Sequence, residues 1–435
     1  MKNNNWEEKS LNELGTLGRG KSKHRPRNAS VLYGGPYPFI QTGDITHSGL
    51  HVLKYTQTYS EVGLAQSKMW DQDTLCIVNA GVNTGDSAIL AFRACFPDSI
   101  IGFVADSEKC DVRFIKYFLD SIKTQIRQVT MGATQDNLSV SKLLSFRVPT
   151  PDIRTQSKIA SVLSAYDNLI ENNTRRICVL EDMVQRIYEE WFIRFRFPGY
   201  NNIEMIESEL GLIPKGWNIY PVQDTLSHNI GGGWGEETAT GEFCVPAYVI
   251  RGTDIPAINQ GSLGKAPLRF HKESNFRSRR IEPGDIVFEV SGGSKDQPVG
   301  RTVLVNAALL QKAEFPVICA SFCRLIRVNS EKMLPELLLL HCKRIYKNRD
   351  IMKYQTQSTG ITNLKITFFI KNEKLIIPEK KLQILFVEEI LPLWRLAEHL
   401  GLKNANLQAT RDLLLPKLIS GEIDVSDVAE KAAAL

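Results

Sequence analysis

The sequence predicts a mixed α/β (α+β) protein in which two globular domains are each followed by one long helix, and the two helices pair antiparallel as a coiled coil. Three observations predict this architecture: a heptad seam that occurs twice, landmarks that recur in the same order in both halves, and short strand-like runs bounded by Gly, Asp and Pro. The 435 residues are enough for more than one domain with its own core.

The first long helix is expected over residues 155–197. Its apolar residues alternate in steps of four and three, and neither Pro nor Gly occurs between Thr155 and Phe192. One polar residue, Asn173, interrupts the apolar series. The seam consists of Ile159, Leu163, Tyr166, Ile170, Asn173, Ile177, Leu180, Val184, Ile187 and Trp191.

A second helix with the same spacing is expected over residues 380–420. Pro392 and Gly401 weaken it and predict a kink. Its seam consists of Phe386, Ile390, Leu393, Leu400, Asn404, Leu407, Leu414 and Leu418.

An antiparallel register follows from the two seams. If Trp191 meets Phe386, then Ile159 meets Leu418 and Asn173 faces Asn404. A buried Asn pair fixes the register of a coiled coil at some cost in stability. The alternative is two unrelated amphipathic helices that pack on separate cores.

The sequence ahead of each helix reads as two diverged copies of one unit. Trp6 matches Trp217, and Asp44-Ile45 matches Asp254-Ile255. Further on, Asp73–Gly81 matches Asp285–Gly293, Asn137-Leu138 matches Asn363-Leu364, and Gln156 matches Gln383. The order never breaks, which predicts an internal two-fold pseudo-repeat. The expected divisions are a first domain at 1–154, the first helix at 155–197, a linker at 198–214, a second domain at 215–379, the second helix at 380–420 and a tail at 421–435.

Composition bounds the class of protein. The sequence starts without an apolar signal segment, and no run approaches the length of a membrane span, so we expect a cytoplasmic protein without a membrane partner. Its eight cysteines show no zinc-ligand spacing and read as buried thiols. A net charge of +5 permits nucleic-acid binding without establishing it.

One enzyme motif matches on paper. Residues 15–22, GTLGRGKS, fit the phosphate loop G-x-x-x-x-G-K-[ST], with Lys21 as its lysine. A phosphate loop needs a buried strand before it and a helix after it, and the flanking residues favour neither. A nucleotide-dependent enzyme is therefore the weakest alternative.

The same residues fit phosphate binding in another way. Five cations occupy every second position, so in an extended chain they project to one side, as a DNA backbone requires. They are Arg19, Lys21, Lys23, Arg25 and Arg27. A solvated loop is the alternative.

Two polar loops are candidates for contacts with base edges. In the first copy Lys68 is the matching cation, and the loop supplies Asn79, Asn83 and Thr84. The candidates in the second copy are Arg277, Arg279, Arg280, Ser291, Lys295, Gln297 and Arg301. Glycine-rich loops are also ordinary turns.

The sequence carries no recognisable signature of catalysis. The sequence contains no [DN]-P-P-[YF] tetrad, no G-x-G-x-x-G after a strand and no recognisable Ser/His/Asp arrangement. We therefore expect no catalytic residue and no cofactor or metal in this chain.

Several stretches resemble the specificity subunit of type I restriction-modification systems. They are residues 132–138 with Pro149–Pro151 and Gln156–Leu163, their second-copy counterparts at 358–364, 377–378 and Gln383, and the ending Leu413–Ile423. Gly231–Gly235 and Arg251–Ile255 resemble the family's target-recognition domains, which adds Arg251 to the DNA-binding candidates.

The resemblance implies two target-recognition domains that each read one half of a split, asymmetric DNA sequence. It implies double-stranded DNA, methyltransferase (modification) subunits and restriction/translocase subunits as partners. Catalysis would lie in those partners, and S-adenosylmethionine, ATP and Mg would be bound there. A two-headed adaptor that binds only protein is the alternative from another class.

Overall fold

The computed structural model describes residues 6–131, 137–292, 297–358 and 361–428. It divides into two units, of which the first comprises Met1–Asn172 with Asn404–Leu435 and the second comprises Asn173–Lys403. Two long helices pass from one unit to the other, so the division does not coincide with the domain and helix limits expected from the sequence. Each unit is described by itself.

The first unit holds the N-terminal domain, whose elements alternate short strands and helices. In chain order they are β1 (Glu7–Lys9), α1 (Leu11–Leu14), β2 (Gly15–Arg19), η1 (Ser30–Leu32), β3 (Tyr33–Phe39), α2 (Thr42–Thr46), β4 (His51–Val52), β5 (Gln57–Tyr59), α3 (Glu61–Ala65), β6 (Met69–Trp70), β7 (Leu75–Val78), β8 (Ser87–Leu90), β9 (Ala94–Cys95), β10 (Ile100–Ala105), α4 (Val112–Ser121), α5 (Lys123–Met131), α6 (Val140–Leu144) and β11 (Val148–Thr150).

Two sheets form the body of this domain. The larger has the strand order β2-β10-β7-β8-β4, the smaller has the order β5-β3-β9-β6, and β1 pairs separately with β11. Every residue of β7 and β8 is buried, as expected for central strands whose two faces are both covered.

Helix α7 (Ile153–Tyr188) begins in the first unit, where Asp152 caps it. The carboxylate of Asp152 accepts hydrogen bonds from the backbone N–H groups of Arg154 and Thr155 at 3.0 and 3.1 Å. The Thr155 hydroxyl and these N–H groups lower the pKa of Asp152. The opening turns of α7 bury Ile159 and Leu163 in the domain core together with Leu418, near the end of α13 (Lys380–Ile419).

The second unit holds the C-terminal domain. Its elements in chain order are η2 (Glu189–Ile193), η3 (Tyr200–Asn202), β12 (Met205–Ser208), β13 (Gly211–Pro214), β14 (Asn218–Pro221), η4 (Val222–Thr225), β15 (Leu226–Gly231), β16 (Phe243–Ile250), η5 (Gly252–Asp254), α8 (Ile255–Asn259), β17 (Leu268–Lys272), α9 (Glu273–Arg279), β18 (Ile286–Glu289), β19 (Ser291–Gly292), β20 (Thr302–Leu304), α10 (Ala307–Lys312), β21 (Val317–Cys319), β22 (Cys323–Val328), α11 (Pro335–Lys347), η6 (Asp350–Tyr354), β23 (Gln355–Ser358), β24 (Ile361–Leu364), α12 (Ile366–Asn372) and β25 (Lys374–Ile377).

The sheets of this domain repeat those of the first. The order β15-β22-β18-β20 corresponds to β2-β10-β7-β8, and β14-β25 corresponds to β1-β11. A parallel pair also recurs, β3 with β9 in one domain and β16 with β21 in the other. The linker expected at 198–214 contains the hairpin β12-β13, which the sequence pattern did not reveal.

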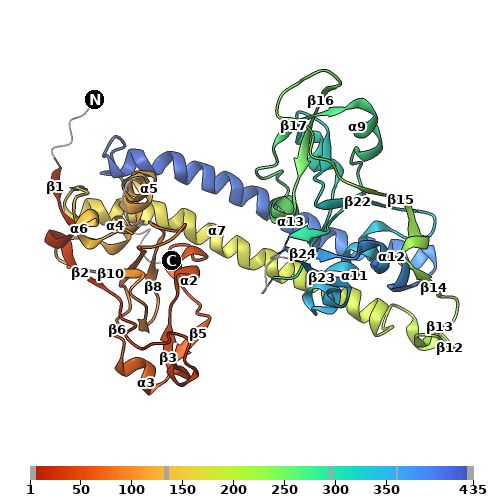
Figure 1. Cartoon of the computed structure of the whole chain (residues 1–435), viewed down its shortest axis with the longest axis horizontal. Helices are drawn as coiled ribbons and strands as arrows, with labels where there is room; N and C mark the ends of the chain where they lie inside the picture. Colours follow the sequence, from red (N-terminus) through yellow and green to blue (C-terminus); the bar gives the residue numbers. More distant parts are fainter. Residues whose placement is uncertain (1–5, 132–136, 293–296, 359–360, 429–435) are drawn as a thin grey trace. The chain divides into compact units, whose positions relative to one another are not determined.

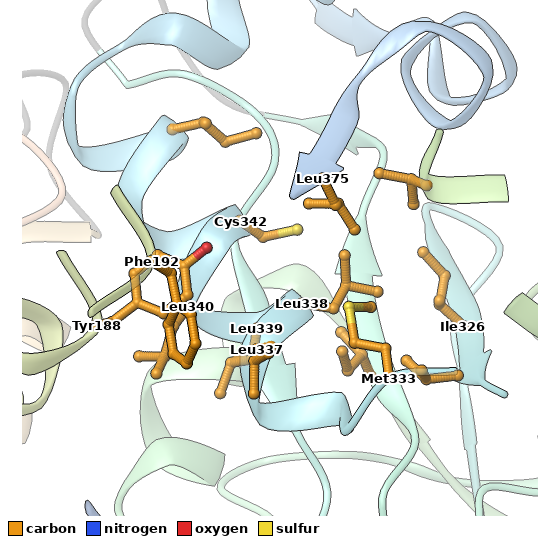
Figure 2. Close-up of a cluster of buried hydrophobic side chains, with 14 of the residues drawn as sticks. Tyr188, Phe192, Ile326, Met333, Leu337, Leu338, Leu339, Leu340, Cys342 and Leu375 are labelled. Carbon is orange, nitrogen blue, oxygen red and sulfur yellow. The ribbon is translucent and has the colours of Figure 1, made fainter. Parts of the chain in front are cut away.

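The two long helices are antiparallel in the second unit. The rings of Trp191, at the end of α7, and Phe386, near the start of α13, lie 5.5 Å apart between centroids. Within this unit α7 and α13 lie side by side (Figure 1), and Ile177 packs with Ala397 and Leu400 further along the pair. Figure 2 shows part of the larger core, where Tyr188 and Phe192 meet leucines of α11.

These contacts agree with the expected register. Asn404 is buried, and its Nδ2 atom donates to the carbonyl oxygen of Ile170 at 3.2 Å, within the first unit. Asn173 belongs to the second unit, so its position opposite Asn404 stays a prediction.

Pro392 and Gly401 do not interrupt α13, which is one continuous helix. A Cβ atom at Gly401 would come within 2.8 Å of the carbonyl oxygen of Gln260, so the glycine permits close contact between α13 and the segment after α8.

The duplication extends to individual hydrogen bonds. The backbone N–H of Gln41 donates to Asp44 at 2.8 Å, and that of Arg251 donates to Asp254 at 2.9 Å. The match of Asp73 with Asp285 is wrong by one residue. Asp73 and Gly284 both have positive φ, and their N–H groups donate to Leu90 and Val305 respectively, so Thr74 is the counterpart of Asp285.

A buried polar network joins α7 to the second domain. Glu373, 9% exposed, lies with one carboxylate oxygen 2.9 Å from Nε2 of His341 and accepts from the Tyr354 hydroxyl at 2.5 Å with the other. Nδ1 of His341 lies 3.5 Å from the hydroxyl of Tyr188 on α7. Burial alone would raise the pKa of Glu373, but the bonds from His341 and Tyr354 and the nearby Lys353 lower it to about 2.

All eight cysteines are free thiols. Among the described residues, no helix combines the length and apolar character needed to cross a membrane.

Candidate nucleic-acid interface

The basic segment of the first domain leaves the end of β2. Arg19, Lys21 and Lys23 are exposed, whereas Gly20 and Ser22 between them are buried. The N–H of Gly20 donates to the carbonyl oxygen of Ile100 at 3.0 Å, and that of Lys21 donates to Phe96 at 3.1 Å. These amides extend the sheet, so the phosphate-loop motif does not form a nucleotide-binding loop here.

The alternation does not continue through the last two cations, which corrects the expectation of five side chains in one row. The chain bends at Arg25 and Pro26. The guanidinium of Arg25 donates to the carbonyl oxygens of Ser22 and His24 at 2.8 and 2.9 Å, and Arg27 pairs with Asp98 at 2.9 Å. Both arginines therefore hold the bend.

The structure brings Lys68 to the same surface. The hydroxyl of Ser67 donates to the carbonyl oxygen of Lys21 at 2.8 Å. Gln66 accepts from the backbone N–H of Lys23 at 2.6 Å. The ammonium of exposed Lys68 lies 3.5 Å from the centroid of the Trp70 ring. Lys21, Lys23 and Lys68 thus form one basic surface.

In the polar loop after β7, two side chains that were expected to contact DNA instead form hydrogen bonds within the domain. Asn79 and Thr84 are only 2% and 3% exposed, so the expectation of free polar groups there is corrected. Nδ2 of Asn79 donates to the carbonyl oxygen of Asp98 at 3.0 Å, and the Thr84 hydroxyl donates to Gly81 at 2.7 Å. Asn83 is half-buried, and the tip of the loop is Val82, 92% exposed.

Asp98 connects this loop with the basic segment. Its side chain pairs with Arg27, and its backbone carbonyl accepts from Asn79. The loop tip and the basic residues therefore belong to one face of the first domain.

The glycine-rich stretch of the second domain occupies the equivalent position. The N–H of Gly232 donates to the carbonyl oxygen of Cys323 at 3.0 Å, as Gly20 donates to Ile100. A Cβ atom would come within 2.3 Å of the Phe96 oxygen at Gly20 and within 2.1 Å of the Ala320 oxygen at Gly232. Only glycine fits either site.

Arginines of α9 lie beside this stretch. Nε of Arg279 donates to the carbonyl oxygen of Gly231 at 2.9 Å. Arg277 is exposed and pairs with Glu273 one turn earlier on the helix, and Arg280 is exposed at the helix end. The structure thus brings Arg279 of α9 to the glycine-rich stretch.

Arg251 and Arg301 were candidates for DNA contact, but the structure pairs each of them with a buried carboxylate of its own domain. Arg251 makes two bonds of 2.9 Å to Asp254, which is 3% exposed. Arg301 pairs through two nitrogens with Glu289, which is 2% exposed, at 2.9 and 2.5 Å. These bonds raise the pKa of both arginines and join neighbouring elements of the fold.

The remaining candidates follow β18. The Ser291 hydroxyl donates to the amide oxygen of Asn363 at 2.5 Å, and Gln297 is exposed. Lys295 lies outside the described residues. In both domains the Asn-Leu landmark joins this loop: Leu138 donates to Asn79, and Leu364 donates to Val290, at 2.8 and 2.9 Å.

Two exposed apolar residues on these faces are not predicted by the sequence pattern. They are Val82 and Phe322, and the latter is 62% exposed in the turn before β22. The sequence signal was an apolar residue directly after a Gly or a Ser, which also fits a buried turn.

Each of the two domains thus has exposed cations beside a polar loop, an arrangement that suits contact with a nucleic acid.

Comparisons with known proteins show which proteins this chain is similar to. A family model described as "Type I restriction modification DNA specificity domain" matches residues 3–182 of this chain. The type I restriction enzyme MjaIX specificity subunit of Methanocaldococcus jannaschii is 23% identical over 97% of this chain and 94% of its own length. The HindI specificity subunit of Haemophilus influenzae is 21% identical over 96% of this chain and 99% of its own length.

A solved structure has the same fold. The type I restriction-modification S subunit from M. genitalium superposes with a TM-score of 0.53 at 16% identity, over 96% of this chain and 97% of that one. This chain is thus similar, over part or nearly all of its length, to type I restriction-modification specificity subunits.

Proposed function

We propose that this chain recognises a bipartite, asymmetric DNA sequence, with one half read by each domain. The observation that carries the proposal is the duplicated interface. Gly20 and Gly232 make equivalent backbone bonds, and the polar loops that begin near Asn79 and Val290 are tied to the same Asn-Leu landmark. Two related faces with different side chains suit two half-sites of different sequence.

The chemistry of each face supports contact with DNA. Lys21, Lys23 and Lys68 supply exposed positive charge in the first domain, and Arg277 and Arg280 supply it in the second. Such cations bind phosphates and fix the position of the protein on the duplex. Base identity is then read by the neighbouring loops.

We further propose that the outer faces of α7 and α13 bind the modification subunits and that the restriction subunits join the same assembly. Apolar side chains point outward from these helices: Leu169, Val179, Met183, Leu385, Leu396 and Leu413, with exposures of 40–70%. Apolar groups left in water on a helix surface favour a protein partner. S-adenosylmethionine, ATP and Mg would be bound by those partners.

Methylation mapping tests the proposal. DNA from cells with this chain and its partner subunits should carry methyl groups at one motif of two specified parts separated by unspecified base pairs. That motif should disappear when the gene for this chain is deleted. A protein-only adaptor predicts that the methylation pattern is unchanged by the deletion.

A further inference from the structure

Phe322 is an aromatic side chain that a hydrogen-bonded turn exposes to water. It is 62% exposed, while Ala320 and Cys323 on either side of the turn are 2% and 0% exposed. The N–H of Cys323 donates to the Ala320 oxygen at 2.8 Å and closes the turn. Burial of a Phe ring is normally favourable, so this exposure costs stability within the isolated chain.

The turn is part of the candidate interface of the second domain. The carbonyl oxygen of Phe322 accepts from the N–H groups of Val290 and Ser291 at 2.9 and 3.3 Å, which ties it to the polar loop. On its other side, Gly232 donates to Cys323 and Gly231 accepts from Arg279. The ring therefore stands between the polar loop and the glycine-rich stretch.

The shared fold does not require an aromatic residue here. The counterpart of Phe322 in the first domain is Ser99, whose carbonyl oxygen accepts from Asn79 at 3.0 Å, as Phe322 accepts from Val290. A serine fulfils the same backbone role. The phenyl ring is thus present in the second domain alone of these two positions. A side chain that reads a base is expected to differ between the two domains, because their half-sites differ in sequence.

We propose that Phe322 contacts the C5-methyl group of a thymine in the half-site read by the second domain. This inference rests on the proposed function. Thymine is the base that presents a methyl group in the major groove, and apolar side chains recognise it there. The arginines of α9 beside the glycine stretch supply positive charge that suits the adjacent phosphates.

A double substitution of protein and DNA tests the contact. The chain is purified in complex with its partner subunits, and binding is measured by fluorescence anisotropy on a duplex with the mapped motif. Each thymine of the second half-site is replaced in turn by deoxyuridine, which lacks the methyl group. For the wild-type complex, one replacement should weaken binding about fourfold, the value of one buried methyl group.

Phe322→Ser introduces the residue that the first domain has at the equivalent turn. It should weaken binding about tenfold through loss of the ring, and the sensitive thymine position should no longer respond to deoxyuridine. Phe368→Ala is the matched control, because Phe368 is 53% exposed but lies on α12 against Tyr354. It should leave binding unchanged.

Several results would overturn the contact alone: unchanged binding by Phe322→Ser, an equal deoxyuridine effect in both proteins, a half-site without thymine, or failure of the variant to join its partner subunits. The last would assign the ring to a protein interface. A wild-type complex that does not prefer the mapped motif over unrelated DNA would instead overturn the proposed function, and this contact with it.

Discussion

Gln156 and Gln383 hold the same position in the two halves of the chain. Each donates from Nε2 at 2.9 Å to the carbonyl oxygen of the proline just before its long helix, Pro151 or Pro378. Each side chain is almost fully buried, and its Oε1 atom accepts from the backbone residue that precedes α4 or α11. Through these hydrogen bonds, each glutamine connects the start of a long helix to the domain that precedes it.

Loss of these hydrogen bonds should destabilise the protein. Gln383→Leu leaves the backbone groups of Leu334, Lys332 and Pro378 without their partner, so we expect the free energy of unfolding to fall by about 2–4 kcal/mol. Gln156→Leu should have a similar effect. Chemical denaturation measures both changes. The exposed Gln311 is the control, since Gln311→Leu should change stability little, and a comparable loss there would argue against this connection.

The basic surface predicts a change in salt dependence. Lys21→Ala and Lys23→Ala should each weaken DNA binding for all sequences alike and reduce the slope of log affinity against log salt by about 1. Arg93→Ala is the control, because Arg93 lies at the opposite end of the β7-β8 hairpin from the polar loop and pairs with Asp71. If both lysine variants keep the salt-dependence slope of the parent protein, these residues do not contact DNA phosphates.

The buried Asn404 predicts a specific effect on helix register. Asn404→Leu should keep or increase stability, since it replaces a buried polar group by an apolar one, but should permit shifted pairings. In the parent protein, cysteines in place of Leu163 and Leu414 should form a disulfide, whereas cysteines at Leu163 and Leu407 should not. The second pair should cross-link only when Asn404→Leu is present. Identical cross-linking in both backgrounds would show that Asn404 does not set the register.

Acid should weaken the second domain through Glu373. The pKa of this carboxyl falls from its usual 4.5 to about 2 on folding, so its stabilisation is complete above pH 4.5 and is lost as the pH falls toward 2. We expect a loss of about 2–3 kcal/mol across that range. Glu373→Gln should be less stable at neutral pH and should show a smaller further loss in acid. Thermal melting at a series of pH values tests this, and an equal acid dependence in both proteins would contradict it.

The pattern of the sequence predicted the long helices and the repeat because both depend on local spacing. The seam from Ile159 to Trp191 lies within α7 and η2, and the run at residues 285–290 contains β18. The positions of Asn79, Thr84, Arg251 and Arg301 could not be predicted. Whether a polar side chain meets solvent or a backbone partner depends on residues distant in sequence, such as Asp98 for Asn79 and Glu289 for Arg301.

The exposure of Phe322 could not be predicted from the sequence either. An apolar residue between Ser321 and Cys323 suggests burial, and only the tight turn before β22 exposes it. The hairpin β12-β13 was missed because the segment 198–214 that contains it begins with Pro198, Gly199 and two asparagines, which also fit a linker.

The central claim is that two domains read two half-sites at a fixed spacing. Binding of the purified complex to duplexes that carry both mapped half-sites, with the spacer lengthened or shortened by one base pair, tests it most directly. We predict tight binding at the native spacing alone, and weak binding to either altered duplex or to a duplex with one half-site. Equal affinity at all spacings, or full affinity for one half-site alone, would contradict the account.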